Sequence, residues 1–120
     1  MRAIYLVEHG KAGEAFQIRE TPKPVPKPGE VLVKVDGFGL NFADAMARKG
    51  MYRDAPALPG LLGYDVCGTV ERVGNNVKDF VEGDKVTALT RFGGYAEYAV
   101  TDHRALAKIP ANTPITEATA

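Results

Sequence analysis

Residues 30–50 read E-V-L-V-K-V-D-G-F-G-L-N-F-A-D-A-M-A-R-K-G, in which a strand pattern is followed directly by a helix pattern. In the first part, Glu30 to Gly37, apolar and polar side chains alternate. An alternation with period two places every second side chain on the same face of a strand. We therefore expect a strand with one buried face, formed by Val31, Val33 and Val35.

The second part of this stretch, Asn41 to Gly50, predicts a short helix. Asn41 is a good N-cap, and Asp44 stands three positions further on, where a capping box places a carboxylate. Arg48 suits the negative end of the helix dipole, and Gly50 can end the helix. Asp44 can alternatively pair with Arg48, four residues along the same helix face.

Short strand patterns lie on both sides of this unit. The chain holds 13 glycines and 8 prolines, so it is rich in turns and an all-helical bundle does not fit. The expected strands are residues 2–7 and 14–20, which form a hairpin, and residues 65–73, 85–89, 93–100 and 104–109. We expect the stretch 93–100 to open with a turn and to continue as a strand. The fold class that follows is mainly β with short helices, in a compact β-barrel or sandwich.

Composition limits the partners of the protein. A chain of 120 residues fits one domain. Residues 114–120 begin a helical pattern without completing it, which is expected either of the front portion of a longer protein or of a frayed end of the domain. The 15 basic and 15 acidic residues balance, so we expect no nucleic-acid or acidic-membrane partner. Because no signal core or membrane span is visible, the sequence predicts a cytoplasmic location.

The supply of catalytic groups is small. Cys67, His9 and His103 are the entire set of cysteine and histidine ligands, and they have no ligand spacing, so we expect no metal site. Cys67, in V-C-G-T-V, is typical of a small buried hydrophobe. The remaining candidates are neutral hydrogen-bond donors that can polarise a carbonyl, namely Asn41, Tyr52 and Tyr64. The structural alternative is that Asn41 only caps the helix and Tyr52 only packs.

Three motifs resemble one family in order and spacing. They are G-L-N-F-A-D-A-M-A-R-K-G-M-Y at residues 39–52, L-P-G-L-L-G-Y-D-V-C-G-T-V-E-R-V-G-N-N-V at residues 58–77 and E-G-D-K-V at residues 82–86. They are similar to those of the medium-chain dehydrogenases/reductases, especially the zinc-independent quinone oxidoreductases of the branch related to the vesicle amine transport protein. The resemblance implies that residues 1–120 are a GroES-like β-barrel of the alcohol dehydrogenase N-terminal type, and that the C-terminal Rossmann domain is not present in this chain.

The resemblance also indicates which positions would carry zinc ligands. In zinc-dependent relatives a G-x-C-x-x-D segment supplies a cysteine ligand and a G-H-E segment supplies a histidine. Here Asn41 stands in the place of the cysteine and Tyr64 in the place of the histidine. The family therefore implies an enzyme without zinc. Asp65 replaces the glutamate that is commoner in this segment, which shortens the side chain by one methylene.

The family resemblance implies that the full-length protein reduces quinones or α,β-unsaturated carbonyls by hydride transfer from NADPH. The implied catalytic residues are Asn41, Tyr52, Asp44 and Tyr64, with Asn41 and Phe42 beside the cofactor. The full-length protein would be a homodimer, and this fragment alone would be inactive because the cofactor binds mainly to the missing domain. The alternative is a non-enzymatic GroES-like module that binds an apolar ligand or a partner protein.

Overall fold

The computed structural model describes residues 1–119, and these residues form mainly strands with a few short helices. The elements in chain order are β1 (Arg2–Leu6), α1 (Ala12–Ala15), β2 (Phe16–Glu20), β3 (Glu30–Phe38), α2 (Phe42–Arg48), β4 (Gly60–Leu61), β5 (Asp65–Val73), β6 (Lys85–Leu89), β7 (Tyr98–Asp102), the 3-10 turn η1 (His103–Ala105), β8 (Leu106–Lys108) and α3 (Ile115–Ala118). The predicted fold class is confirmed.

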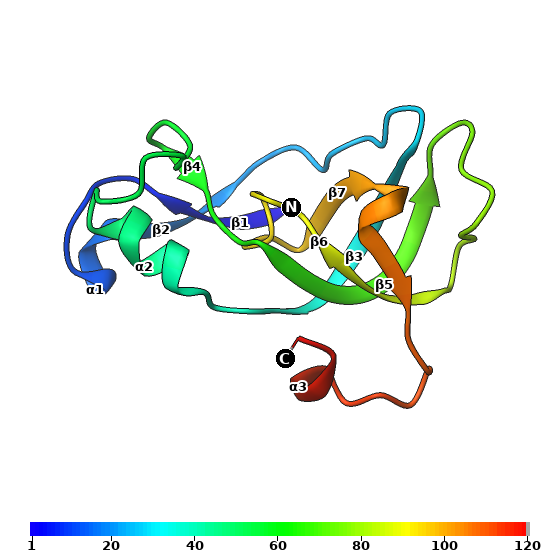
Figure 1. The fold of residues 1–120 in the computed structure, drawn as a ribbon. Helices are drawn as coiled ribbons and strands as arrows, with labels where there is room; N and C mark the ends of the chain where they lie inside the picture. The colour runs from blue at the N-terminus through cyan, green and yellow to red at the C-terminus, as the bar shows by residue number, and fades with distance from the viewer. Residues whose placement is uncertain (120) are drawn as a thin grey trace.

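The strands make two antiparallel sheets. The smaller has the order β2-β1-β4, and the larger has the order β7-β3-β5-β6-β8. Figure 1 shows that the larger sheet curls into a half-barrel, with the smaller sheet and α2 at one end of it and α3 at the C-terminus below. The junction between the smaller sheet, α2 and the start of β5 is where the candidate residues gather.

Strand β3 is an interior strand of the larger sheet, between β7 and β5. The prediction that only one of its faces is buried fails at Leu32, which is buried as completely as Val31 and Val33, whereas Lys34 and Asp36 on that face are exposed. Val35 is only half-buried. A period-two pattern identifies the strand, but whether the second face is covered depends on segments distant in the sequence.

Two apolar clusters hold the fold together. The first lies within the larger sheet and contains the buried side chains of Val31, Val33, Val66, Val70, Phe80, Val86 and Ala88. The second joins the smaller sheet to α2 and contains Leu6, Ala15, Ala47, Leu62 and Tyr95. Phe38, the last residue of β3, packs against both clusters. The segment after Phe38 therefore leaves the sheet at a fixed point.

The hairpin predicted near the N-terminus is confirmed, with β1 and β2 paired from Arg2 opposite Glu20 to Leu6 opposite Phe16. Its predicted bounds need correction. Strand β1 ends at Leu6, and residues 14 and 15 belong to α1 because their backbone N–H groups donate to the Lys11 carbonyl at 3.0 and 2.9 Å. The helical turn buries Ala15 against the second cluster.

The strand predicted over residues 93–100 begins only at Tyr98. The preceding residues cross from one sheet to the other: Tyr95 N–H donates to the Leu62 carbonyl at 3.1 Å, and Ile4 N–H donates to the Tyr95 carbonyl at 2.8 Å. The strand predicted over 104–109 shortens to β8, because η1 precedes it. The helical pattern near the C-terminus forms α3, and residue 120 lies outside the described residues.

Along residues 1–119, no helix has the length and apolar character needed to cross a membrane.

Candidate functional site

The start of α2 carries the first candidate residues. Asn41 is the N-cap as predicted, and it forms a capping box with Asp44 in which the Asn41 backbone N–H donates to Asp44 Oδ2 at 3.0 Å. The alternative pairing of Asp44 with Arg48 is wrong. Arg48 donates to the Gly10 carbonyl instead, and the Asp44 side chain turns into the core.

Asp44 is the buried anchor of the site. Its residue exposure is 5%, and Oδ2 also accepts a hydrogen bond from the Tyr95 hydroxyl at 2.8 Å. Within the described part of the chain Oδ1 has no partner. Burial, and next the hydrogen bond to Asp44, raise the pKa of Tyr95. Tyr95 is not among the residues predicted from sequence, because it lies 51 residues from Asp44 and belongs to no motif that signals a contact.

Removing the Tyr95 hydroxyl is expected to destabilise the protein. Tyr95→Phe keeps the ring, which packs against Phe38 at a centroid distance of 4.7 Å, but leaves the Asp44 carboxylate with one partner fewer. The expected loss is about 1–3 kcal/mol in the free energy of unfolding, measured by urea denaturation. Tyr5→Phe is the matched control, because the Tyr5 hydroxyl bonds only to the neutral Thr21 hydroxyl. Equal losses in the two variants would contradict the anchoring role of Asp44.

The Asn41 side chain is exposed, but a hydrogen bond holds it in place. Its amide Nδ2 donates to Asp65 Oδ2 at 2.8 Å. Asp65 Oδ1 accepts from the backbone N–H of Gly39 at 3.1 Å. The first residue of β5 thus holds the loop that leads into α2. The sequence drew attention to Asp65 only as a shorter replacement for glutamate.

Tyr52 and Tyr64 form a pair. The Tyr64 hydroxyl donates to the Tyr52 hydroxyl oxygen at 2.6 Å, and the two rings meet edge to face. The backbone of Tyr64 is fixed by Thr90, whose N–H donates to the Tyr64 carbonyl at 2.8 Å. Gly63 has φ of +108°, and a Cβ there would lie 2.7 Å from the Gly94 Cα. The turn that presents Tyr64 therefore requires glycine at residue 63.

Burial, and next the hydrogen bond to Tyr52, raise the pKa of Tyr64 to about 12. In the unfolded chain this phenol ionises near 10. The folded state therefore holds the proton more tightly, so the stabilisation is complete below pH 10 and is lost as the pH rises from 10 towards 12. We expect the free energy of unfolding to fall over this range, and to fall less steeply in Tyr64→Phe. A parallel decline in both proteins would contradict the assignment.

The structure groups the candidate residues into two hydrogen-bonded sets. One contains Asn41 and Asp44, and the other contains Tyr52 and Tyr64. No hydrogen bond between the side chains of the two sets is found across residues 1–119. Phe42 belongs to neither set, and its side chain is 80% exposed.

Possible metal ligands do not gather. Within residues 1–119 no three His, Cys, Asp or Glu side chains are grouped so that they could hold an ion. His103 Nδ1 lies 3.0 Å from Asp79 Oδ1, at the surface. Cys67 is 2% exposed, as predicted for a small buried hydrophobe, and burial raises the pKa of its thiol. It is not an activated nucleophile.

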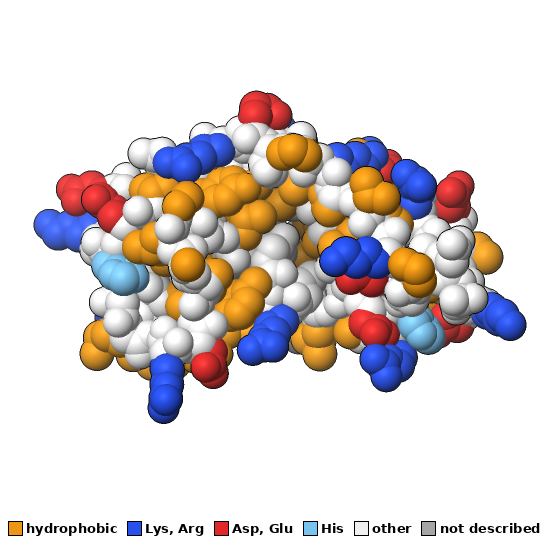
Figure 2. Space-filling view, turned by 90° about the horizontal axis from the view of Figure 1, so that it is seen from above, with side chains coloured by type: hydrophobic (Ala, Val, Ile, Leu, Met, Phe, Trp, Pro, Cys, Tyr) orange, Lys and Arg blue, Asp and Glu red, His pale blue; other side chains and the backbone are white. Residues whose placement is uncertain are grey.

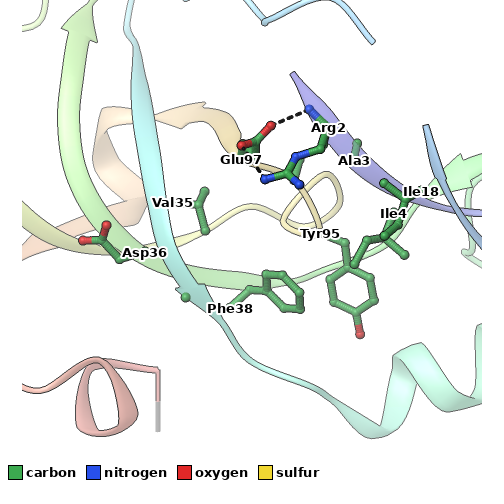
Figure 3. Close-up of a pocket in the computed structure, with 11 residues that line it drawn as sticks. Arg2, Ala3, Ile4, Ile18, Val35, Asp36, Phe38, Tyr95 and Glu97 are labelled. Atoms are coloured by element: carbon green, nitrogen blue, oxygen red, sulfur yellow. Dashed lines mark hydrogen bonds and ion pairs between the residues drawn. The ribbon is translucent and has the colours of Figure 1, made fainter. Parts of the chain in front are cut away.

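An apolar cleft of about 270 Å³ opens between the N-terminal hairpin and the second half of β3. Figure 3 shows Val35 and Phe38 on one side of it, Ile4 and Ile18 on the other, and the Arg2–Glu97 ion pair near them. In the space-filling view, hydrophobic side chains gather in a hollow near the middle of the face (Figure 2). None of Asn41, Tyr52 and Tyr64 lines this cleft. Tyr64 lines a separate cleft of about 400 Å³ with Thr90 and Leu89.

The curled antiparallel half-barrel and the motifs around residues 39–52 define a class of protein. Residues 27–111 match the family described as alcohol dehydrogenase GroES-like domain. The chain belongs to this family, and the resemblance inferred from its motifs is confirmed.

Two individual relatives with similar sequences are a quinone oxidoreductase and a VAT-1 homolog-like protein. Human quinone oxidoreductase is 40% identical over 112 residues, which are 92% of this chain and 34% of the relative. The mouse synaptic vesicle membrane protein VAT-1 homolog-like is 33% identical over 120 residues, 100% of this chain and 28% of the relative. The chain therefore spans about a third of the length of the curated relatives that it matches.

Solved structures of the same kinds of protein superpose closely on this chain. The human VAT-1 homolog-like protein superposes with a TM-score of 0.94 at 33% identity, over 99% of this chain and 38% of that chain. The quinone oxidoreductase of Escherichia coli, solved in complex with NADPH, gives a TM-score of 0.91 at 30% identity, over 100% of this chain and 36% of that chain.

Proposed function

We propose that residues 1–120 are the substrate-binding and catalytic half of a zinc-independent oxidoreductase that reduces quinones or α,β-unsaturated carbonyls by hydride transfer from NADPH. The observation that supports this proposal best is that the two former zinc-ligand positions, residues 41 and 64, carry neutral hydrogen-bonding side chains held by defined partners. Such donors can stabilise negative charge on a carbonyl oxygen without a metal.

In this proposal the amide of Asn41 and the hydroxyl of Tyr52 bind the substrate oxygen. NADPH, when bound, supplies the hydride. Tyr52 can transfer its proton to the reduced oxygen, and Tyr64, which donates to the Tyr52 oxygen, can pass on to Tyr52 a proton taken from solvent water, so that both phenols end protonated. Asp44 holds the Asn41 segment through the capping box and does not itself transfer a proton.

The residues around Asn41 fit the nicotinamide end of NADPH. Leu40 and Phe42 flank Asn41, and their side chains are 79% and 80% exposed, so an apolar surface lies beside an amide donor. Such a surface fits a nicotinamide ring, and we assign this contact to Asn41 and Phe42. The N-terminus of α2 is already occupied by Asn41 and Asp44. We therefore assign the phosphates and the adenine of NADPH to a Rossmann domain in the rest of the full-length protein.

The experiment that tests this function uses the full-length protein. We expect NADPH to bind and to be oxidised when a benzoquinone or an enone is added, and we expect purified protein to contain no zinc. A protein that ignores NADPH in calorimetric titration contradicts the enzymatic function. One tightly held zinc per chain contradicts the zinc-independent mechanism.

We further propose that the full-length protein is a cytoplasmic homodimer that does not bind nucleic acid. The balanced charge supports the absence of nucleic acid, since a phosphate-binding surface needs an excess of basic residues. Light scattering of the full-length protein measures the oligomeric state, and a monomer at micromolar concentration contradicts the dimer.

A second candidate is a non-enzymatic GroES-like binding module. The apolar cleft beside Val35 and Phe38 favours it, because this cleft is large enough for a small apolar ligand and lies apart from Asn41 and Tyr52. Val35→Asp, made in the full-length protein, tests this candidate. Loss of apolar-ligand binding in the variant, in a protein that does not oxidise NADPH, supports the binding module, and NADPH oxidation by the unsubstituted protein contradicts it.

A further inference from the structure

Asp65 occupies a particular place between the sheet and the loop before α2. It is the first residue of β5, and its backbone is paired with Leu89 of β6, so its Cα is fixed by the larger sheet. Both carboxylate oxygens turn to the loop: Oδ1 accepts from Gly39 N–H at 3.1 Å and Oδ2 from Asn41 Nδ2 at 2.8 Å. No Lys, Arg or His side chain in the described residues forms an ion pair with this carboxylate. The loop is its hydrogen-bonding partner.

The contact determines the orientation of the Asn41 amide. A primary amide has one acceptor oxygen and two donor hydrogens. The oxygen faces the Asp44 backbone N–H in the capping box, and one hydrogen is donated to Asp65. A flipped amide would place its oxygen against the carboxylate, where two acceptors repel each other. One N–H of Asn41 therefore remains for a further acceptor.

The short side chain at residue 65 matches the backbone it binds. A Cβ on Gly39 would collide with the Asp65 carboxylate, so the loop approaches this closely only because residue 39 is glycine. A glutamate would extend the carboxylate by one methylene into the same space. Asp65, Gly39 and Asn41 are therefore mutually dependent.

We propose that Asp65 is a positioning residue, which fixes the Asn41 amide so that its remaining N–H binds the substrate carbonyl. This inference rests on the proposed function, in which Asn41 is a carbonyl donor. Asp65 does not touch the reacting atoms. It acts through Asn41, so its loss removes the orientation of the donor and leaves the donor itself in place.

The test is a double-mutant cycle in the full-length enzyme. Asp65→Asn replaces one carboxylate oxygen by an NH2 group, so only one of the two contacts that Oδ1 and Oδ2 make with Gly39 and Asn41 keeps an acceptor at its present position. The Gly39 N–H retains its other acceptor, the Asp65 backbone carbonyl at 3.2 Å. We expect kcat to fall about tenfold with the KM for NADPH unchanged. In an Asn41→Ala background the same substitution should change kcat less than twofold, because the group that Asp65 orients is gone. Asp79→Asn, at an exposed aspartate paired with His103, is the matched control and should leave kcat unchanged.

The outcomes separate the inference from the function it rests on. If Asn41→Ala lowers kcat but Asp65→Asn does not, or if Asp65→Asn lowers kcat equally in both backgrounds, the positioning role is wrong and the donor role of Asn41 stands. If Asn41→Ala leaves kcat unchanged, both fail. Asp65→Glu should also lower kcat, and full activity in that variant overturns the geometric argument.

A spectroscopic measurement on the unsubstituted protein tests the proposal even if the variants do not fold. In a proton–nitrogen NMR spectrum the two Nδ2 protons of Asn41 should resonate unusually far apart, because one of them is bonded to a carboxylate and the other is not. An ordinary separation between these two signals overturns the proposal without any substitution.

Discussion

Asn41→Ala is expected to lower the turnover of the full-length enzyme about 100-fold, with little change in the KM for NADPH. In the proposed mechanism the Asn41 amide stabilises negative charge that develops on the substrate oxygen, and loss of one such donor in a dry site typically reduces kcat by a factor of about 10²–10³. The amide is held on two sides, by Asp44 and by Asp65, so it needs no reorganisation during the reaction. Steady-state kinetics with a benzoquinone measure the effect.

The same substitution removes the N-cap of α2, which costs about 1 kcal/mol of stability. Asn41→Ser separates the two effects, because serine caps a helix but offers no amide N–H. We expect Asn41→Ser to recover the melting temperature and to remain slow. If kcat recovers in the serine variant, or is unchanged in the alanine variant, Asn41 acts only as the N-cap of α2 and not as a catalytic donor.

The elements predicted correctly from sequence are those whose signals are local. Alternation identified β3, and the Asn41–Asp44 spacing identified α2, because both patterns reflect contacts within one element. The burial of Leu32 on the second face of β3 had no such signal. It depends on how the larger sheet curls, which is set by contacts between distant segments.

The segment before β7 illustrates the same limit. The sequence G-G-Y-A-E-Y-A-V has strand composition, and a strand over residues 93–100 follows from it. In the fold, the Tyr95 backbone instead bonds to Leu62 and Ile4, both on the side of the smaller sheet, and its hydroxyl reaches Asp44. Tertiary contacts override local propensity here, and they create a member of the site that no spacing rule could indicate.

The candidate site was predicted in part. The correspondence of residues 41 and 64 to zinc-ligand positions of zinc-dependent relatives came from the family resemblance, and residue types alone favoured structural over chemical roles. The structure adds their partners, Asp65 and Tyr52, at 2.8 and 2.6 Å. Nothing in the sequence indicated that Asp65 would face Asn41, because they lie 24 residues apart on different elements.

Gly68→Ala is expected to destabilise the protein by about 3 kcal/mol. Gly68 lies in the middle of β5, opposite Val35 of β3 and Val86 of β6, and it is fully enclosed. A Cβ at this position would collide with the carbonyl oxygen of Lys34. Because the obstacle is backbone of the neighbouring strand β3, no side-chain rotation can relieve it, and β3 and β5 must separate. Glycine inside a strand pattern often marks such a close approach.

Gly13→Ala is the matched control for this prediction. Gly13 lies in α1, and a Cβ there would meet no atom within 4 Å. Alanine in a short helix should raise the free energy of unfolding by about 0.5–1 kcal/mol, so the two Gly→Ala changes are expected to have opposite signs. Urea denaturation of both variants measures this. A Gly68→Ala protein as stable as the unsubstituted chain would mean that β3 and β5 are not in the tight register described. The attachment of Asp65, three residues earlier in β5, to the Asn41 loop would then lose its rigid support.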